Sequence, residues 1–285
     1  MKYKAIKDLN QLSDTELVIQ VSEGLELIVD HFLSVEKDVR YLAEQNRQCG
    51  FNILEEVLKE EAAKFLILLD AIRCPRVPPD NFSKQLGRFS DHLAKGIYAE
   101  VYDYRPGDFG EIHRAVEREC HEYYLDGPND FDWIFRNEIL QIREEKIYVD
   151  YIESDGEHMW LTPKRYYHPE MYPFTSYLRS RVVEVATALW KAGCTKPDAL
   201  QLLISIWRSI KMSDDFSWHE LRELNIKTLE ELDKNSLLNT QDDTVCFEII
   251  DRWLFPLYSL DIRKIKVNIE KLKDTREQRF FNMFY

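Results

Sequence analysis

The feature that most constrains the fold is the stretch 52–73, which is apolar on most sides when it is drawn as a helix. Large apolar side chains form one stripe at helical spacing, and others broaden that stripe around the helix: Leu54, Leu58, Phe65, Leu69 and Ile72, then Ile53, Val57, Ile67 and Leu68. A helix of this kind is buried by neighbours on several sides. Pro75, Pro78 and Pro79 end it. The sequence therefore predicts a central helix around which other elements pack.

The rest of the chain predicts a mostly α-helical protein with one small hairpin. The 285 residues include only 9 Gly and 10 Pro, which disfavours an all-β chain full of tight turns. Apolar residues at helical spacing predict further helices at 24–47, 83–104, 109–124, 131–146, 175–192, 197–211, 217–235 and 247–259. Between 147 and 161 the apolar residues alternate on either side of a turn, which predicts a β-hairpin.

A connector rich in Pro and Tyr, at 162–175, indicates a division of the chain. We expect a helical first domain over 1–162 and a helical C-terminal region over 163–285. The residues 280–285 are mainly aromatic, and an exposed apolar patch favours association. We therefore expect this tail to dock on the body of the protein or on a partner.

The formal net charge of −13 excludes a uniformly basic surface of the kind that binds nucleic acid. A local basic groove on an acidic body is still compatible with RNA chemistry, whereas tight sequence-independent binding of a duplex is disfavoured. The five cysteines are scattered without a Cys-x-x-Cys pair, which is typical of reduced thiols in the cytosol. We see neither a signal peptide nor a membrane span, and we expect a cytoplasmic protein without membrane attachment.

Charged residues interrupt the apolar helix 52–73. Glu60 and Glu61 lie four and three residues before Lys64, and either spacing allows an ion pair. Glu61 shares a face with apolar residues, so we expect its carboxylate to point toward the apolar side. Glu61 either forms a structural ion pair that contributes to packing specificity, or its carboxylate orients a catalytic base in a cleft.

The predicted helix 83–104 places Arg88, His92 and Lys95 on one face. Two flanking cations favour the neutral imidazole. Neutral imidazole can take the proton of a ribose 2′-hydroxyl while an adjacent cation holds the phosphate, which is the minimum for RNA cleavage without a metal. The alternative is an ordinary solvated polar face.

The predicted helix 131–146 places Arg136 and Arg143 on one face, together with Leu140 and Ile147. Two arginines at this spacing can clamp phosphates through forked hydrogen bonds. They can equally pair with Glu60, Glu61 or other acidic residues.

A further helix carries His113, Glu117 and His121 at intervals of four residues, a spacing that metal-binding helices use. The same segment holds several other charged residues, so an ordinary exposed face explains it as well. The sequence has no HExxH motif, no phosphate-binding glycine loop and no Gly-x-Ser-x-Gly element. Classical nucleotide-binding and serine-hydrolase functions are therefore disfavoured.

Taken together, these clusters resemble the AbiV group of bacterial abortive-infection proteins, which belongs to the HEPN superfamily. Three short elements within about residues 40–152 carry the resemblance: Glu60-Glu61-Ala62-Ala63-Lys64, His92-Leu93-Ala94-Lys95 and Arg143-Glu144-Glu145-Lys146-Ile147-Tyr148-Val149-Asp150. The resemblance implies a HEPN-like up-and-down helical bundle that often dimerises. It also implies an antiphage effector of toxin type that stops translation, in a superfamily in which many members are RNases that act without a metal.

The chain departs from the usual nuclease motif of that superfamily, in which Arg, often Arg-Asn, is followed after four to six residues by His. Arg136-Asn137 matches the first half, but no His follows at that spacing. Only three residues separate Arg88 from His92. Either the catalytic set is rearranged around His92, or the fold persists without nuclease activity.

On this resemblance we expect a possible endoribonuclease that uses neither metal nor cofactor, with His92 as the base. The expected catalytic residues are His92, Glu61, Lys64, Arg143 and Tyr148, and the expected phosphate-binding residues are Arg88, Lys95, Arg136 and Asn137. Expected partners are RNA of tRNA or ribosomal type, a second copy of the chain, and a phage or regulatory protein. The alternative is a non-catalytic helical interaction protein, whose ion pairs are structural and which recruits a protein partner.

Overall fold

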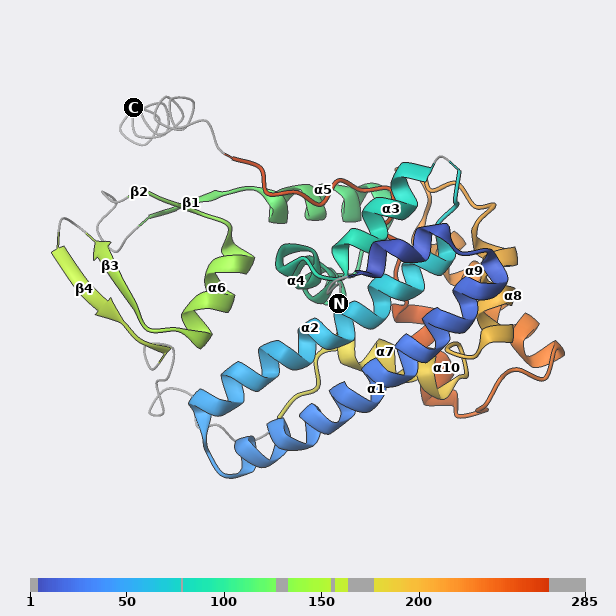
Figure 1. Cartoon of the computed structure of the whole chain (residues 1–285), viewed down its shortest axis with the longest axis horizontal. Coiled ribbons are helices and arrows are strands. Elements are labelled where there is room, and N and C mark those ends of the chain that lie inside the picture. The colour runs from blue at the N-terminus through green and yellow to red at the C-terminus, as the bar shows by residue number, and fades with distance from the viewer. Residues whose placement is uncertain (1–4, 78, 127–132, 155–156, 164–176, 267–285) are drawn as a thin grey trace.

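The computed structural model describes residues 5–77, 79–126, 133–154, 157–163 and 177–266, and it is mostly helical (Figure 1). The helices in chain order are η1 (Ala5–Gln11), α1 (Asp14–Glu44), α2 (Gln48–Arg73), α3 (Pro79–Arg88), α4 (His92–Val101), α5 (Phe109–Cys120), α6 (Glu138–Ile147), α7 (Arg181–Lys191), α8 (Pro197–Trp207), α9 (Trp218–Lys234) and α10 (Asp243–Arg252). The strands form two antiparallel pairs, β1 (Tyr123–Asp126) with β2 (Trp133–Arg136), and β3 (Asp150–Ser154) with β4 (Glu157–Leu161). The predicted fold class, mostly α with a small β-hairpin and a helical C-terminal region, is confirmed.

Helix α2 is the centre of the molecule, as its sequence predicts. It packs against α1, α3, α4, α6, α7 and α8. Its apolar residues from Phe65 to Ile72 are almost completely buried. Helix α1 lies beside α2 along most of its length (Figure 1) and begins with a capping box, in which Ser13 and Glu16 satisfy each other's backbone N–H groups.

A sealed polar network ties the C-terminal region to α2. The Arg73 guanidinium contacts the rings of both Trp207 and Trp253, 4.4 Å and 4.3 Å from their centroids, and it donates to Asp70. Asp70 also accepts hydrogen bonds from the Tyr98 hydroxyl at 2.6 Å and from the Leu257 backbone N–H at 2.9 Å. Helices from both sides of the predicted division at residue 162 thus contribute to one hydrophobic core. The division itself stays a prediction.

The segment predicted as one helix over 83–104 is two helices. Helix α3 ends at Arg88, and α4 begins at His92 after a short turn. Asp91 is the reason, because its side chain accepts the N–H of Ala94 and thereby caps a new helix at this point. Arg88 and His92 therefore do not share the face of one helix.

The segment predicted as a helix over 131–146 is also different. Trp133–Arg136 is strand β2, which pairs with β1, and the helix α6 begins only at Glu138. Asn137 caps it through a bond from the Leu140 N–H, while the aromatic and β-branched residues before it suit a strand. The helix predicted over 109–124 correspondingly ends at Cys120, before β1.

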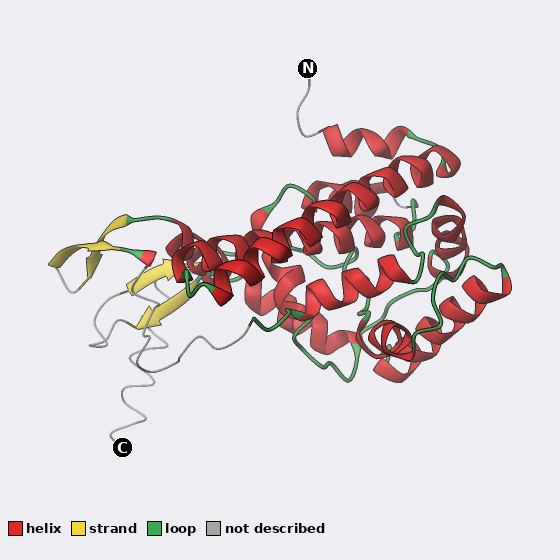
Figure 2. Ribbon diagram, turned by 90° about the horizontal axis from the view of Figure 1, so that it is seen from below, coloured by secondary structure: helices red, strands yellow, loops and turns green. Residues whose placement is uncertain are grey.

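The hairpin β3–β4 lies where the alternation predicts it, with Asp150 opposite Leu161 and Ser154 opposite Glu157. The two hairpins and α6 lie on one side of the molecule, away from α8, α9 and α10 (Figure 1), and the strands gather at one end of the molecule in Figure 2 as well. Most of the predicted connector, at 164–176, and the aromatic tail, at 280–285, lie outside the described residues. Among the described helices, none combines the length and apolar character needed to cross a membrane.

Candidate functional site

Three helices meet at one carboxylate, that of Glu60 in the middle of α2. Its oxygens accept hydrogen bonds from Lys95 Nζ at 2.5 Å, Arg143 Nε at 2.7 Å and His92 Nδ1 at 2.8 Å. His92 and Lys95 come from the first turn of α4, and Arg143 comes from α6. We call these four residues the Glu60 cluster. The structure thus brings together His92, Lys95 and Arg143, which the sequence singles out. They surround Glu60, whereas the sequence favours the adjacent Glu61.

Helix α6 reaches the cluster because α4 carries a glycine where the two helices touch. A Cβ atom added to Gly96 would lie 2.2 Å from Cγ2 of Ile139, well inside van der Waals contact. Ile139 and Arg143 are one helical turn apart on α6, so the close approach at Gly96 sets the position of Arg143. The glycine is needed here for space.

The electrostatics of the cluster favour an ionised Glu60. Burial alone would raise the pKa of this carboxyl, but the hydrogen bonds from Lys95, His92 and Arg143 outweigh it and hold the pKa below its ordinary value. Burial acts on Lys95 in the opposite sense and lowers the pKa of its ammonium, although Glu60 partly offsets this effect. A carboxylate surrounded by three nitrogen donors is the arrangement in which a buried negative charge is stable.

The ionised carboxylate also decides which His92 nitrogen carries the proton. A carboxylate only accepts hydrogen bonds, so His92 Nδ1 must donate to it. Lys95 Nζ lies 3.2 Å from the same nitrogen, and because an ammonium only donates, this contact would favour an unprotonated Nδ1. The contact of Nδ1 with Glu60 is shorter, at 2.8 Å, and therefore determines the tautomer. The other ring nitrogen, Nε2, makes no hydrogen bond to any described residue. In the neutral ring, Nε2 is therefore a free base.

The members of the cluster differ sharply in exposure. The Lys95 side chain is 5% exposed and that of Glu60 is 11% exposed, whereas the Arg143 side chain is 20% exposed and the His92 side chain 47%. The charges that position the imidazole are therefore inside, and the imidazole itself reaches solvent. Such an arrangement supplies an oriented base next to a cation, which is the minimum for acid–base chemistry on a phosphodiester.

Glu61 and Lys64 form a pair of their own, with Lys64 Nζ 2.5 Å from Glu61 Oε1. Lys64 also lies over the ring of Phe89, 5.5 Å from its centroid. The structure therefore does not bring Glu61 to His92, and the expected orienting role falls to Glu60. Adjacent residues on a helix point about 100° apart, so only one of the two glutamates can face α4.

Arg88 and Asn137 are structural in this fold. Arg88 is buried and donates to Gln85 and to the backbone carbonyls of Leu257 and Leu260, so its guanidinium is not available to a phosphate. Asn137 is 3% exposed, caps α6, and donates to the carbonyls of Glu119 and His121 at 2.6 Å and 3.1 Å. The expected phosphate-binding role does not fit either residue.

Two expected site residues lie outside the Glu60 cluster. Tyr148 directly follows α6 as its C-cap and is 53% exposed, and its backbone N–H donates to the Glu144 carbonyl. Its hydroxyl has no contact with the cluster among the described residues. Arg136 is the last residue of β2, and its side chain lies outside the described part of the structure.

The spaced histidines of α5 do not form a metal site. His113 Nδ1 lies 3.1 Å from Asp214, while His121 bonds the backbone carbonyl of Glu117 at 2.7 Å. No group of three His, Cys, Asp or Glu residues in the described part of the chain has a geometry that could hold a metal ion. The helical spacing is present, but the side chains turn to other partners.

The sequence does contain a signal for Glu60. It lies on the second apolar stripe of α2, three residues after Val57 and seven before Ile67. Because α4 packs against α2 as well, this second stripe is also turned inward, and a charge on it needs partners from another helix. Glu61 lies on the first apolar stripe, with Leu54 and Leu58. Because that stripe is the more obvious one in the sequence, it favours Glu61 over Glu60.

Comparison with known proteins adds no relative: no family model, no curated protein and no solved structure matches the chain. The resemblance to the AbiV group therefore stays a prediction.

Proposed function

We propose that the Glu60 cluster performs acid–base chemistry on RNA, in an abortive-infection or toxin-type effector that stops translation. The observation that carries the proposal is the state of His92. Its Nδ1 is held by a buried carboxylate, its side chain is 47% exposed, and its Nε2 makes no hydrogen bond to a described residue. In enzymes, a carboxylate that fixes an imidazole in this way orients it as a general base.

The cluster also supplies a cation for the phosphate. Arg143 uses Nε on Glu60, and its two terminal nitrogens make no hydrogen bond to any described residue. A guanidinium fixed at one edge presents the remaining donors to a phosphate in a defined direction. Lys95 is too deeply buried to touch a substrate, so its part is to hold Glu60 ionised.

The reaction that fits these groups is attack by the neighbouring 2′-hydroxyl of RNA. His92 Nε2 takes the hydroxyl proton, the 2′-oxygen bonds to phosphorus, and the bond from phosphorus to the 5′-oxygen breaks. The products are a 2′,3′-cyclic phosphate and a 5′-hydroxyl end, with the leaving oxygen protonated by water or by the imidazolium. DNA lacks the 2′-hydroxyl, so the chain is expected to spare it.

Expression of three forms of the protein from a tight inducible promoter tests the proposal. His92→Ala removes the base, and His113→Ala is the matched control, since His113 is 48% exposed and also contacts one carboxylate. We expect growth arrest with fragmented RNA in the wild type and in His113→Ala, and neither effect in His92→Ala. Equal RNA fragmentation in all three forms contradicts the assignment.

A second candidate, the non-catalytic interaction protein, is favoured by the β3–β4 hairpin. Tyr151 and Trp160 lie opposite each other on it, 58% and 69% exposed, with ring centroids 5.0 Å apart. Paired exposed aromatics are typical of protein interfaces. If this candidate is right, growth arrest persists in His92→Ala with intact RNA and is lost in Trp160→Ala.

A further inference from the structure

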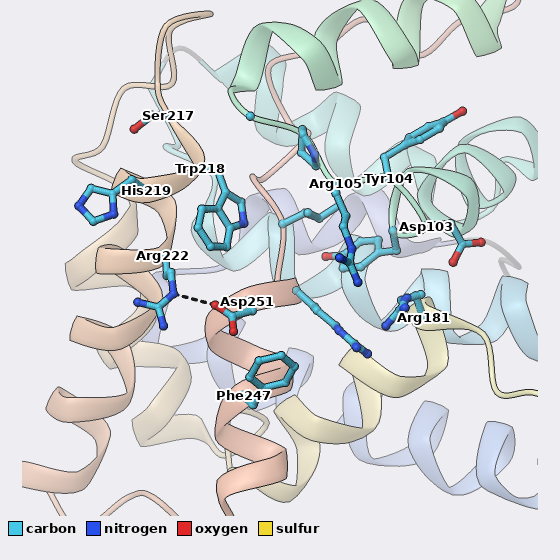
Figure 3. A pocket seen from close by; sticks show the side chains of 15 residues that line it. Asp103, Tyr104, Arg105, Arg181, Ser217, Trp218, His219, Arg222, Phe247 and Asp251 are labelled. Atoms are coloured by element: carbon cyan, nitrogen blue, oxygen red, sulfur yellow. Dashed lines mark hydrogen bonds and ion pairs between the residues drawn. The ribbon is translucent and has the colours of Figure 1, made fainter.

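A second concave site lies at the other end of α4. A cavity of about 710 Å³ is lined by the loop that follows α4 and by the first residues of α7 and α9 together with α10 (Figure 3). Pockets of this size hold small molecules and cofactors. His92 is the first residue of α4 and the cavity begins past its last, so the length of the helix, about 15 Å, separates the two sites.

Arginines line this cavity together with two aspartates, Asp103 and Asp251, in a protein whose net charge is −13. Four arginines line it: Arg105, Arg181, Arg222 and Arg252. Arg252 Nη1 and Arg181 Nη1 lie 3.0 Å and 3.7 Å from the same oxygen of Glu184, so two guanidinium groups converge on one carboxylate. A second carboxylate, that of Glu248, lies 2.8 Å from Arg252 Nη1, so the charges of Arg181 and Arg252 are balanced within the fold.

Part of this positive charge has no partner within the described chain. Arg105 is exposed and makes no hydrogen bond or ion pair to a described residue. Arg222 donates Nε to Asp251 at 2.7 Å, which fixes the side chain and leaves its terminal nitrogens without a described hydrogen-bond partner. The side chains of Arg105 and Arg222 lie on either side of Trp218 (Figure 3). Guanidinium groups with free donors at one cavity are suited to binding a phosphate group.

Two aromatic side chains, those of Trp218 and Phe247, line the same cavity as these arginines. Trp218 is the first residue of α9, and its ring lies 6.0 Å from the Arg222 guanidinium. Phe247, on α10, is 49% exposed beside Asp251 (Figure 3). An indole face next to arginines can stack a nucleobase while the arginines hold the phosphate.

We propose that this cavity binds a nucleoside phosphate, with Arg105 and Arg222 on the phosphate and Trp218 against the base. The ligand is either a free nucleotide or the phosphorylated end of an RNA strand, which share this chemistry. The proposal is independent of the reaction proposed at His92, because no residue of the Glu60 cluster lines the cavity.

Isothermal titration of the full chain tests this site with five probes: adenosine, inorganic phosphate, AMP, ATP, and a short single-stranded RNA with a 5′-phosphate. The variants are Arg105→Ala, Trp218→Ala and the control Arg263→Ala, whose side chain is 80% exposed on an ion pair elsewhere. Arg105 is exposed, so its replacement leaves the fold intact, and circular dichroism checks Trp218→Ala.

We expect a nucleotide to bind at least tenfold more tightly than adenosine or phosphate, and to lose at least tenfold in affinity in Arg105→Ala and in Trp218→Ala but not in Arg263→Ala. Tighter binding of the RNA, displaced by AMP, assigns the strand end as the ligand. Tighter binding of AMP or ATP assigns the free nucleotide. The proposal is overturned if none of the phosphate-containing probes binds, or if inorganic phosphate binds as tightly as the nucleotides. It is also overturned if nucleotide binding survives Arg105→Ala.

Discussion

Helix α2 carries two buried carboxylates, and their surroundings are opposite in kind. Asp70 is 1% exposed, and its donors Arg73 and Tyr98 are completely buried, so the network is sealed. Glu60 is 9% exposed, and its donors include a histidine whose side chain is 47% exposed. Both carboxylates are fully supplied with donors from other parts of the chain. The difference teaches that Asp70 serves the core, because none of its donors reaches solvent, whereas the Glu60 cluster includes an imidazole that does.

Removal of the sealed carboxylate is expected to have the largest effect on stability. Asp70→Ala leaves the Arg73 guanidinium buried without its partner, which costs about 3–5 kcal/mol in the free energy of unfolding. Urea denaturation followed by circular dichroism measures this loss. Glu231→Gln is the control, because it breaks an ion pair with Lys234, whose side chain is 63% exposed, and should leave the midpoint unchanged. A small loss in Asp70→Ala would remove the contrast between the two carboxylates.

Glu60→Gln sharpens the comparison, because it removes the charge of the other buried carboxylate, in a cluster that is partly open. Lys95 and Arg143 lose their common carboxylate, but Arg143 can turn to water, so we expect a loss of about 2 kcal/mol, less than for Asp70. Cleavage of RNA should fall to the level of His92→Ala, since the imidazole is no longer oriented. Urea denaturation and an RNA cleavage assay on the same preparation separate the two effects. Full activity with lowered stability would make Glu60 purely structural.

Gly96→Ala tests whether the contact between α4 and α6 positions Arg143. The added methyl group meets Ile139, which costs about 1–3 kcal/mol of overpacking and shifts α6. We expect RNA cleavage to fall, and Ile139→Ala in the same chain to restore part of it by making room. Gly107→Ala is the control, because its nearest neighbour is a Glu111 side-chain atom at 3.8 Å. Equal effects of the two alanines would contradict the role of the contact.

The smallest effect expected is on the acid side of the pH profile. The hydrogen bonds to Glu60 overcome its burial and hold its pKa below the ordinary value of 4.5. The folded state therefore binds this proton more weakly than the unfolded state, so the stabilisation is complete above pH 4.5 and is lost as the pH falls through the lower folded pKa. The stability difference between wild type and Glu60→Gln should shrink from pH 6 to pH 3. A constant difference over this range would show that the ionisation of Glu60 contributes nothing.

The sequence predicts an element correctly where its hydrophobic pattern fits only one kind of secondary structure. The apolar stretch 52–73 predicts the central helix, and the alternation after residue 147 predicts the β3–β4 hairpin. The sequence does not reveal the break at Asp91 or the cap at Asn137, because a capping residue inside an apolar periodic pattern resembles an ordinary polar position until the neighbouring elements are known. Strand β2 was missed for the related reason that short apolar runs fit a helix and a strand equally well.

The candidate site was predictable in composition but not in its centre. His92, Lys95 and Arg143 were selected from charges on apolar helices, and the structure places them together. Choosing Glu60 over Glu61 requires knowing that α4 covers the second stripe of α2, which is tertiary information. The phosphate-binding role predicted for Arg88 is wrong, since its partners include backbone carbonyls about 170 residues further along the chain.

The most direct test of the account is the chemistry of the cut made by the purified protein. Wild type, His92→Ala and His113→Ala are incubated with a single-stranded RNA in the presence of EDTA, and the ends of the fragments are identified by mass spectrometry. The account predicts fragments with 2′,3′-cyclic phosphate and 5′-hydroxyl ends from wild type and His113→Ala, and a rate about 10²–10⁴-fold lower in His92→Ala. Intact RNA in all three reactions, or cleavage that does not depend on His92, would contradict it.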